Sequence, residues 1–444
     1  MKRITLNLKL TCLLGVLSMT LIACSSTGGT SGDNLSGTSN KPAGAVEISM
    51  VIEAEDYNTY SDWANKFAEI NADKGWTVKF IQVAGGQVQG KQDTLIAAKQ
   101  APDIIVGGDI WVYTQYKYLE PLDELITRDN AVVKIEDFIP QIINGCKYNQ
   151  KTYYLPQYFN SSLLYYNKDI IENYDKANPG SEIGFPSSDW TYRQFINAAK
   201  KLTIGSGNNV SQWGSYNTIG WWGEWLTHIR QNKGEIMSQD GWVTLNTPEA
   251  VAGLKEYLSK LNGEDKCGFT TGQNELGGFA GKCTAMNFGG HISDWADLKR
   301  VKDLNWDVEL LPNNNGSRTG EFAIDGLGVY KKSEHKEVAW EFIKYLCRQK
   351  TGEDLLNHPY VACRESEKQE LLAIPHDQRP APQNLEAVYE SVKYNKILPQ
   401  FNYFSTVATT YIQDQINKAV EGKITPEKAL EDATNNANAY IRSL

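Results

Sequence analysis

The sequence predicts an α/β fold, because segments with strand-like and helix-like patterns alternate along the chain after residue 45. Residues 46–52, 76–83 and 103–106 have the apolar or alternating patterns of strands, and two glycines follow the third segment. Residues 60–70 and 92–100 lie between these strands and have the patterns of helices. The order strand, helix, strand, helix, strand implies right-handed crossovers and a parallel sheet.

The later helices carry clear start signals. Thr191 and Gln194 form the pair of a capping box. The Thr-Pro dipeptides at 247–248 and 425–426 each supply an N-cap followed by a proline of the first turn, and Ser333 is the expected start of another helix. The inward faces predicted from apolar spacing are Trp63, Phe67 and Ile70; Phe195, Ala199 and Leu202; Val251, Leu254, Leu258 and Leu261; Val338, Phe342 and Leu346; and Leu430, Ala433, Ala437 and Tyr440.

Polar and aromatic side chains follow the first and third predicted strands. Ligands bind beyond the carboxyl ends of parallel strands, so residues at these ends are candidates for a binding site. Glu55, Asp56 and Tyr57 follow the first strand, and Asp109 and Trp111 follow the glycines after the third. Carboxylates suit ligand hydroxyl groups because a charged acceptor makes the stronger hydrogen bond. The alternative is that these residues form solvated loops.

Residues 1–23 have the features of a lipoprotein signal peptide. Three basic residues flank the start of an apolar stretch at 10–23 that is short for a membrane span. Leu-Ile-Ala-Cys at 21–24 fits the bacterial lipobox, so we expect Cys24 to carry acyl chains such as palmitate and to anchor the protein to the extracytoplasmic face of the cell membrane. Each buried methylene contributes about 0.8 kcal/mol, so two chains anchor stably. The alternative is an ordinary secretory signal with a chance cysteine.

Composition bounds the class of protein. Residues 24–45 are mostly small and polar, which predicts a flexible tether. About 400 residues follow it, too many for one core, so two domains are expected. The net charge of −9 argues against a nucleic-acid partner. The chain has 12 Trp and 23 Tyr, and such rings can grip a flat, amphipathic ligand, although most rings are expected to pack in the core.

The cysteine and histidine pattern gives no support to a metal site. Of seven cysteines, Cys12 leaves with the signal and Cys24 is the anchor, so five remain, and at least one of them is unpaired within the chain. No Cys-x-x-Cys occurs and the five histidines are scattered, so neither metal nor cofactor is expected. Pairing of Cys347 with Cys363 is the predicted disulfide, and pairing of Cys267 with Cys283 is its rival.

Six short motifs follow one another in the order found in one protein family. They are Ala-Pro-Asp-Ile-Ile-Val at 101–106; Tyr-Tyr-Leu-Pro at 153–156 with Ser-Leu-Leu-Tyr-Tyr-Asn-Lys-Asp at 162–169; the segment 186–202 with Trp190 and Thr191; Phe-Ala-Gly-Lys-Cys-Thr-Ala-Met at 279–286; Gly-Leu-Gly-Val at 326–329; and Ala-Trp-Glu-Phe-Ile-Lys-Tyr-Leu at 339–346. From about residue 46 to residue 444 the chain resembles the extracellular solute-binding proteins of bacterial ABC importers, in the carbohydrate family that includes maltose-binding protein. Residues 287–291 depart from the family pattern, and so does Cys283.

The resemblance implies a two-lobed fold with a hinge and a ligand cleft between the lobes. Residues 46–158 with 284–325 are expected to form the N-terminal lobe, and residues 159–283 with 326–444 the C-terminal lobe. A monomeric, lipid-anchored receptor is implied that is not an enzyme, binds a sugar or oligosaccharide, and delivers it to the transmembrane permease of an ABC transporter. No nucleic acid, metal or cofactor takes part.

The resemblance also extends the candidate site. Gln157 and Tyr158 lie at the expected first crossing between the lobes, Trp295 follows the strand of the fourth motif, and Asp325 precedes the last crossing. Sugar binding needs flat apolar plates and well-placed polar groups. Trp221 and Trp222 are candidate plates because Gly220 and Gly223 flank them, although a helix packed against a core is the alternative. Trp225 is expected in the core.

Two other functions stay open at this point. An exported polysaccharide-degrading enzyme or a surface glycan-binding module would also use a lipobox and exposed aromatic residues. A glycosidase needs two carboxylates that flank the cleaved bond, and none of the sequence motifs of hydrolases or phosphate-binding loops is complete. A peptide- or polyamine-binding protein of the same fold is the third possibility, because the acidic loops could suit cations.

Overall fold

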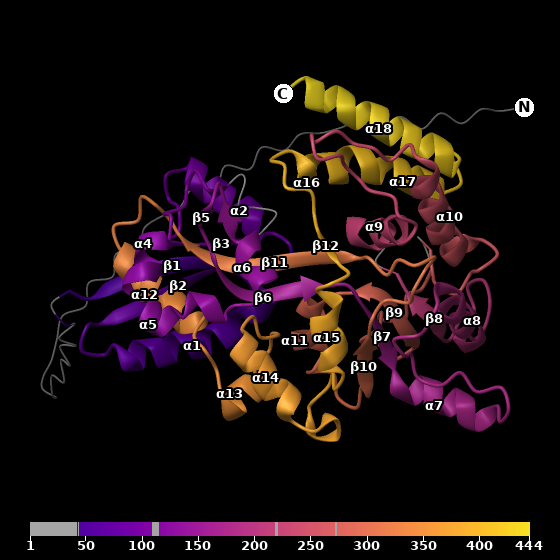
Figure 1. The fold of residues 1–444 in the computed structure, drawn as a ribbon, viewed down its shortest axis with the longest axis horizontal. Helices are drawn as coiled ribbons and strands as arrows, with labels where there is room; N and C mark the ends of the chain where they lie inside the picture. The colour runs from indigo at the N-terminus through magenta and orange to yellow at the C-terminus, as the bar shows by residue number, and fades with distance from the viewer. Residues whose placement is uncertain (1–41, 43, 109–114, 218–220, 271–272) are drawn as a thin grey trace, which may run out of the picture. The chain divides into compact units, whose positions relative to one another are not determined.

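The computed structural model describes residues 42, 44–108, 115–217, 221–270 and 273–444, which belong to one compact unit. Helices and strands alternate around two main sheets, which confirms the predicted α/β class (Figure 1). A two-stranded hairpin of β4 (Lys147–Tyr148) and β5 (Lys151–Thr152) completes the described strands.

The first sheet has the strand order β12-β11-β3-β1-β2, and β6 pairs with the opposite edge of β11 from β3. Its strands are β1 (Val46–Glu53), β2 (Trp76–Val83), β3 (Ile104–Gly108), β6 (Leu155–Ser161), β11 (Glu321–Val329) and β12 (Lys396–Ile397). β1 runs parallel to both β2 and β3, so the predicted parallel start is confirmed. β11 runs antiparallel to β3 and β6 and therefore brings a late segment of the chain into this sheet.

Two helices of the first sheet differ in detail from the prediction. α1 (Tyr57–Ile70) buries Tyr60, Ala64 and Phe67, whereas Ile70 is 69% exposed, so the expected inward position of Ile70 is wrong. The helix turns its last residue to solvent because the buried stripe follows the 3.6-residue period from Tyr60. α2 (Val88–Ala97) begins four residues before the predicted helix at 92–100 and ends three residues before its predicted end. The helix cannot continue to residue 100 because Lys99 adopts a positive φ of 60°.

The second sheet has the strand order β10-β7-β9-β8. Its strands are β7 (Leu163–Asn167), β8 (Trp213–Tyr216), β9 (Thr284–Gly290) and β10 (Trp306–Glu309). α8 (Tyr192–Leu202) packs against it, and the predicted capping box is present: the Thr191 side chain accepts from the Gln194 backbone N–H, and the Gln194 side chain accepts from the Thr191 backbone N–H. The apolar residues of α8 and β9 form a separate core cluster.

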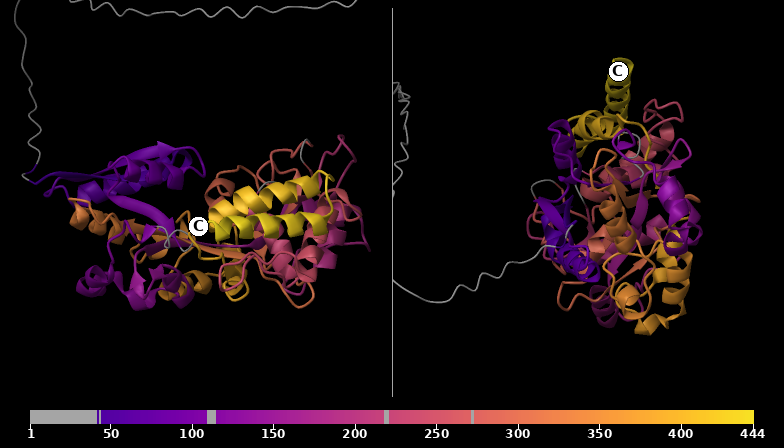
Figure 2. Two further views of the ribbon diagram at one scale, coloured as in Figure 1. Left: turned by 90° about the horizontal axis from the view of Figure 1, so that it is seen from above. Right: turned by 90° about the vertical axis from the view of Figure 1, so that its left-hand side faces the viewer.

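A third core cluster lies among the C-terminal helices. Both predicted Thr-Pro starts are confirmed, because Thr247 caps α10 (Pro248–Asn262) and Thr425 caps α18 (Pro426–Arg442). α17 (Gln413–Val420) and α18 lie side by side, as the yellow pair in Figure 2 shows. The other elements of this part are α9 (Trp222–Gln231), α16 (Phe404–Thr406) and the π-helical turn η5 (Val407–Ile412).

The start of α12 (Lys336–Leu346) lies three residues later than predicted. The Ser333 hydroxyl donates to Asp103 Oδ1 at 2.6 Å and accepts from the His335 backbone N–H at 3.0 Å. Ser333 thus stabilises the turn before the helix and is not the start of the helix itself. Val338, Phe342 and Leu346 are buried as predicted.

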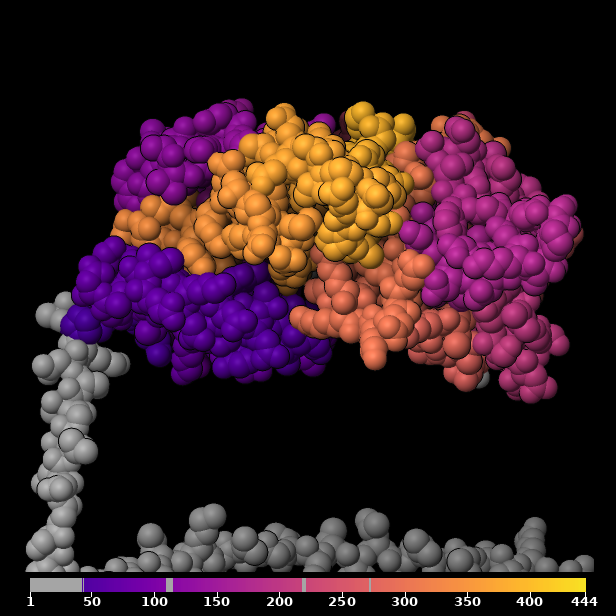
Figure 3. Space-filling view, turned by 90° about the horizontal axis from the view of Figure 1, so that it is seen from below, coloured from indigo at the N-terminus to yellow at the C-terminus, as the bar shows by residue number. Residues whose placement is uncertain are grey.

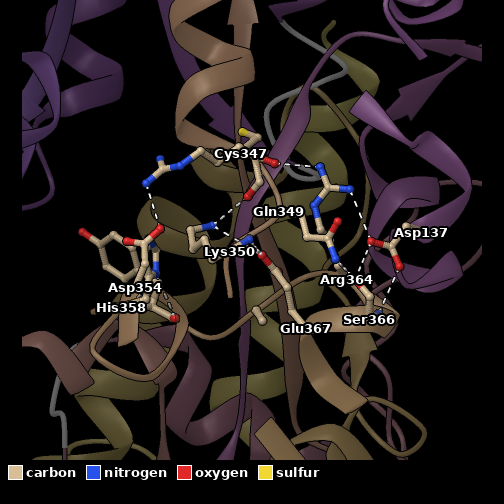
Figure 4. Close-up of polar contacts among 12 residues, drawn as sticks. Asp137, Cys347, Gln349, Lys350, Asp354, His358, Arg364, Ser366 and Glu367 are labelled. Atoms are coloured by element: carbon tan, nitrogen blue, oxygen red, sulfur yellow. Dashed lines mark hydrogen bonds and ion pairs between the residues drawn. The ribbon is translucent and has the colours of Figure 1, made fainter. Parts of the chain in front are cut away.

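A segment after α12 bridges the two sheets on one face of the body (orange in Figure 3). On the first-sheet side, Arg364 donates to the Cys347 backbone carbonyl at 2.7 Å and lies 3.6 Å from Asp137, which also accepts from Ser366 (Figure 4). On the second-sheet side, Asn384 donates to the Val308 carbonyl at 3.1 Å. The remaining helices are α4 (Asp123–Arg128), α5 (Asn130–Val133), α6 (Pro140–Gly145), α7 (Lys168–Ala177), α11 (Trp295–Leu298), α13 (Gly352–Leu356), α14 (Glu365–Ala373) and α15 (Leu385–Ser391), with the single turns η1 (Ala54–Asp56), η2 (Ile135–Asp137), η3 (Ile292–Asp294) and η4 (His376–Gln378).

The membership of strands in the two sheets differs from the expected lobe boundaries. Residues 284–325 were expected in the N-terminal lobe, but β9 and β10 pair in the second sheet. Residues from 326 onward were expected in the C-terminal lobe, but the second half of β11 pairs in the first sheet. Motif order along the sequence does not reveal hydrogen-bond partners, so it does not locate the later crossings. The chain passes from β6 of the first sheet to β7 of the second close to the expected first crossing at Tyr158.

The strands that connect the sheets are tied together by one buried side chain of α9. Arg230 is 3% exposed and donates to the backbone carbonyls of Gly320 at 3.0 Å, Lys396 at 2.8 Å and Ile397 at 3.0 Å. Gly320 precedes β11, and the other two residues form β12. The planar guanidinium of α9 therefore holds two segments of the chain together, the one that enters β11 and the one that forms β12.

Cys347 and Cys363 are free thiols in the described part of the chain, and so are Cys267 and Cys283; the predicted pairing of Cys347 with Cys363 is therefore absent there, as is the rival pairing. The thiols of Cys347 and Cys363 are buried in the first core cluster, and burial raises the pKa of Cys347 to about 12. Among the described residues, none of the helices combines the length and apolar character needed to cross a membrane.

Candidate ligand-binding site

A cavity of about 400 Å³ lies at the carboxyl ends of β1 and β3, at the edge of the sheet where the sequence predicts a ligand. β6 and β11 close it from the other side. Its lining consists of Met50, Val51, Ile52, Glu53, Asp56, Tyr60, Gly86, Val88, Gln89, Val106, Tyr158, Asn160, Ser293 and Asp325. Its size is within the range of pockets that hold small organic ligands.

Three carboxylates line this cavity, and each is held by one donor of the protein. Glu53 Oε1 accepts from the Gly86 backbone N–H at 2.6 Å. Asp325 Oδ2 accepts from Asn160 Nδ2 at 2.8 Å. Asp56 accepts from the hydroxyl of Tyr360. One hydrogen bond leaves each carboxylate with further acceptor capacity for a ligand.

The cavity disfavours charge on these carboxylates. Burial raises the pKa of Asp325 to about 7; the hydrogen bond from Asn160 opposes the rise, and the charge of Glu53 adds to it. Burial also raises the pKa of Glu53, against the hydrogen bond from Gly86, and it raises that of Asp56, against the hydrogen bond from Tyr360. Raised values at grouped acids in a cavity are typical of functional sites.

Tyrosine rings form the apolar part of the site. Tyr158 stacks on Tyr360 with ring centroids 4.2 Å apart and an interplanar angle of 17°. The hydroxyl of Tyr60 donates to Gln157 Oε1 at 2.8 Å, which fixes the Tyr60 ring at the cavity wall. The site thus combines flat apolar rings with carboxylate and amide groups, the combination that a hydroxylated ring requires.

The structure brings three of the predicted residues together in the cavity: Asp56, Tyr158 and Asp325. Glu55 and Tyr57 lie on the same turn but are exposed outside the lining. Gln157 is 6% exposed and reaches the site only through Tyr60. The predictions for Asp109 and Trp111 concern residues outside the described part of the chain.

The predicted site tryptophans among the described residues, Trp221, Trp222 and Trp295, do not line this cavity. Trp295 is 2% exposed, and its indole N–H donates to the Tyr165 hydroxyl at 2.7 Å, so we assign it to the core and correct the expectation that it contacts ligand. Trp222 packs edge-on against Phe404 with centroids 6.1 Å apart. Trp221 packs edge-on against His291 at 4.7 Å. Trp225 is fully buried, as expected from the sequence.

Several residues at the cavity are not among the predicted site residues. Glu53 is the last residue of β1, and its place at the carboxyl end of a predicted parallel strand could have indicated that it lines the cavity. Asn160 lies beside Tyr158 on β6, and Ser293 donates its backbone N–H to Asn160 Oδ1 at 2.7 Å. Tyr360 comes from a segment without regular secondary structure, and no local pattern in the sequence indicates its role.

Comparison with known proteins gives consistent results. The family model described as bacterial extracellular solute-binding protein matches residues 54–352. A protein of Brucella abortus (strain 2308) named as a binding protein is 22% identical over 424 residues, which cover 91% of this chain and 95% of that protein.

Solved structures show the same fold. The ABC substrate-binding protein of Listeria monocytogenes in complex with cycloalternan is 24% identical with a TM-score of 0.76, covering 89% of this chain and 99% of that one. Maltose-bound MalE3 of T. maritima is 20% identical with a TM-score of 0.69, covering 89% and 100%. The GacH receptor of Streptomyces glaucescens, solved with acarbose, is 17% identical with a TM-score of 0.70, covering 88% and 97%.

Proposed function

Because this chain belongs to the bacterial extracellular solute-binding protein family, we propose that it is a receptor that binds a carbohydrate and delivers it to the permease of an ABC transporter. The family consists of binding proteins, so the chain is not an enzyme. The single observation that carries the carbohydrate assignment is the cavity in which three carboxylates meet a wall of tyrosine rings. Structural relatives that hold cycloalternan, maltose and acarbose support the same class of ligand.

The ligand is proposed to bind first to the cavity of the first sheet, and the second lobe then closes on it. Such a closure is a hinge motion, and a ligand drives it only through contacts that differ between the open and closed forms. Trp221 and Trp222 begin a helix beside the second sheet, so we propose them as ligand plates of the closed form. Glu55 and Tyr57 are proposed as ligand contacts from the cavity rim, and Gln157 is proposed to act through Tyr60. Asp109 and Trp111 stay proposed contacts on the grounds of the sequence alone.

Attachment to the membrane is proposed to occur through Cys24, for the sequence reasons given above. The Cys24→Ala protein is expected to carry no acyl chains in mass spectrometry and to leave the membrane fraction. Retention of the variant at the membrane would contradict the anchor without affecting the carbohydrate proposal.

Binding is tested by calorimetry with oligosaccharides on the wild type and on single alanine variants. Burial of about 80 Å² of apolar surface between a ring and a sugar face yields about 2 kcal/mol, or about a thirtyfold change in the dissociation constant. Tyr158→Ala is expected to lose affinity by this amount, and Trp221→Ala and Trp222→Ala likewise if the second lobe closes as proposed. Trp242→Ala, at an exposed tryptophan outside the cavity lining, is the control. Normal binding by all three variants would place the ligand elsewhere.

A further inference from the structure

We propose that the ligand of this cavity is a sugar that carries a protonated amino group. The inference rests on the proposed carbohydrate function and narrows its substrate class. It starts from an imbalance of charge: the cavity lining contains three carboxylic acids, Glu53, Asp56 and Asp325, but neither lysine nor arginine.

Some buried acids elsewhere in the described chain are neutralised by a lysine. Buried Glu224 pairs with Lys260 at 2.7 Å, and Asp129 pairs with Lys344 at 2.6 Å. By contrast, within the described residues the cavity acids form no ion pair, and their donors are an amide, a backbone N–H and a hydroxyl. The charge of Arg300 lowers the pKa of Asp56, but its effect is smaller than those of burial and of the Tyr360 hydroxyl. Arg300 is itself paired with Asp297 at 3.1 Å.

The segments outside the described residues do not supply the missing charge within the body of the protein. Residues 109–114, 218–220 and 271–272 contain neither lysine nor arginine. Burial raises the pKa of all three acids, so their charged forms are costly in the cavity. A neutral sugar leaves this cost unchanged. A ligand cation would remove this cost.

An organic ammonium fits the geometry better than a metal ion does. Among the described residues no group of three His, Cys, Asp or Glu side chains is placed to hold a metal. The acids sit on different elements, Glu53 at the end of β1, Asp56 in η1 and Asp325 on β11. An ammonium group carries three N–H donors and can bond separate acceptors. Stacked tyrosine faces also attract cations, and the Tyr158–Tyr360 pair lies beside Asp56.

The remaining lining suits the rest of a sugar. Asn160 and Ser293 provide an amide and a hydroxyl for ring hydroxyl groups, and Gln89 also lines the cavity. The side chain of Asn160 is fixed at both ends, by Asp325 and by the Ser293 backbone N–H. Such fixed polar groups select orientation. A bare polyamine would make no use of the tyrosine wall and these amides together.

The test is calorimetry at pH 7, near the pKa of Asp325, with two matched pairs of ligands. One pair is glucosamine oligosaccharides and cello-oligosaccharides of equal length, which share a backbone and differ in the amino group. The other is acarbose and maltotetraose. We expect the amine member of one pair to bind at least tenfold more tightly than its neutral partner.

Equal or tighter binding of the neutral members would overturn the inference and leave the proposed function intact. Absence of binding by these and by all other carbohydrates tested would overturn both, and spermidine binding as tightly as the amino sugar would overturn the sugar assignment.

Variants separate charge from shape. Asp325→Asn and Glu53→Gln keep the side-chain volume and are expected to lower affinity for the amine ligand at least tenfold, while the neutral partner changes less than threefold. Asp62→Asn removes an exposed charge of α1 outside the cavity lining and is the control. Equal losses for both members of a pair would show that the acids bind hydroxyl groups, which would overturn the inference.

Discussion

Asp325 is expected to make the folded protein less stable as the pH rises, and Asp325→Asn should remove this effect. Its pKa in the fold is about 7, against an ordinary value of 3.8. Between these values the native state keeps a proton that the unfolded chain has already lost. Stability therefore falls as the pH increases through this interval, since it rises with pH only where the unfolded state binds more protons.

The size of the effect follows from the same two values. The interval between 3.8 and about 7 corresponds to at most about 4 kcal/mol at 1.36 kcal/mol per pH unit. Solvent that enters the cavity screens the charge, so we expect at least about 1 kcal/mol. An asparagine at position 325 can accept the same hydrogen bond from Asn160 and carries no charge, so Asp325→Asn resembles the protonated acid.

Urea denaturation at pH 4 and pH 8 measures this difference. Wild type and Asp325→Asn should have similar free energies of unfolding at pH 4, and the variant should be more stable at pH 8. Asp62→Asn, at an exposed acid, should show no such pH-dependent gain. A variant that is equally stable or less stable at pH 8 would refute the argument that burial in the cavity strains this carboxylate. Stability sacrificed at a binding site is expected where function requires the group.

Three further variants test other parts of the structure. Glu224→Gln should lower the free energy of unfolding by about 3–5 kcal/mol because it leaves the buried ammonium of Lys260 without its carboxylate; a loss below about 1 kcal/mol in urea denaturation would count against this. Thr191→Ala should cost about 1 kcal/mol in the same measurement through loss of the capping box, and an unchanged midpoint would disprove the role of the cap. Arg230→Lys should cost about 1–3 kcal/mol, since one ammonium cannot replace the guanidinium bonds to three carbonyls; unchanged stability would show that these bonds contribute little.

Local patterns in the sequence predict the elements of this fold well. The strand at 46–52, the capping box at Thr191 and the Thr-Pro starts at Thr247 and Thr425 all depend on interactions within a few residues, and all are confirmed. The location of the cavity also follows from the sequence, because parallel strands align their carboxyl ends.

Long-range partners could not be predicted in this way. Trp295 and Tyr360 are both aromatic residues near polar neighbours, yet one lies in the core and the other holds Asp56 beside the cavity. Their difference arises from which segments pack against them, and no periodicity records that. The same holds for β9, whose pairing with β7 and β8 places it in the second sheet.

The position of β11 constrains how this protein can fold. This strand lies between β3 and β6, and Asp325 pairs with Gly108 across more than half the body of the chain (Figure 1). Closing so long a loop costs entropy before any contact repays it, so sheets with such distant pairings form slowly. A fragment that ends before residue 321 lacks the strand that joins β3 to β6 and should not fold as a separate module. Residues 321–329 must therefore be made before the first sheet can form, and the unfolded state of the shorter chain is compatible with the proposed export.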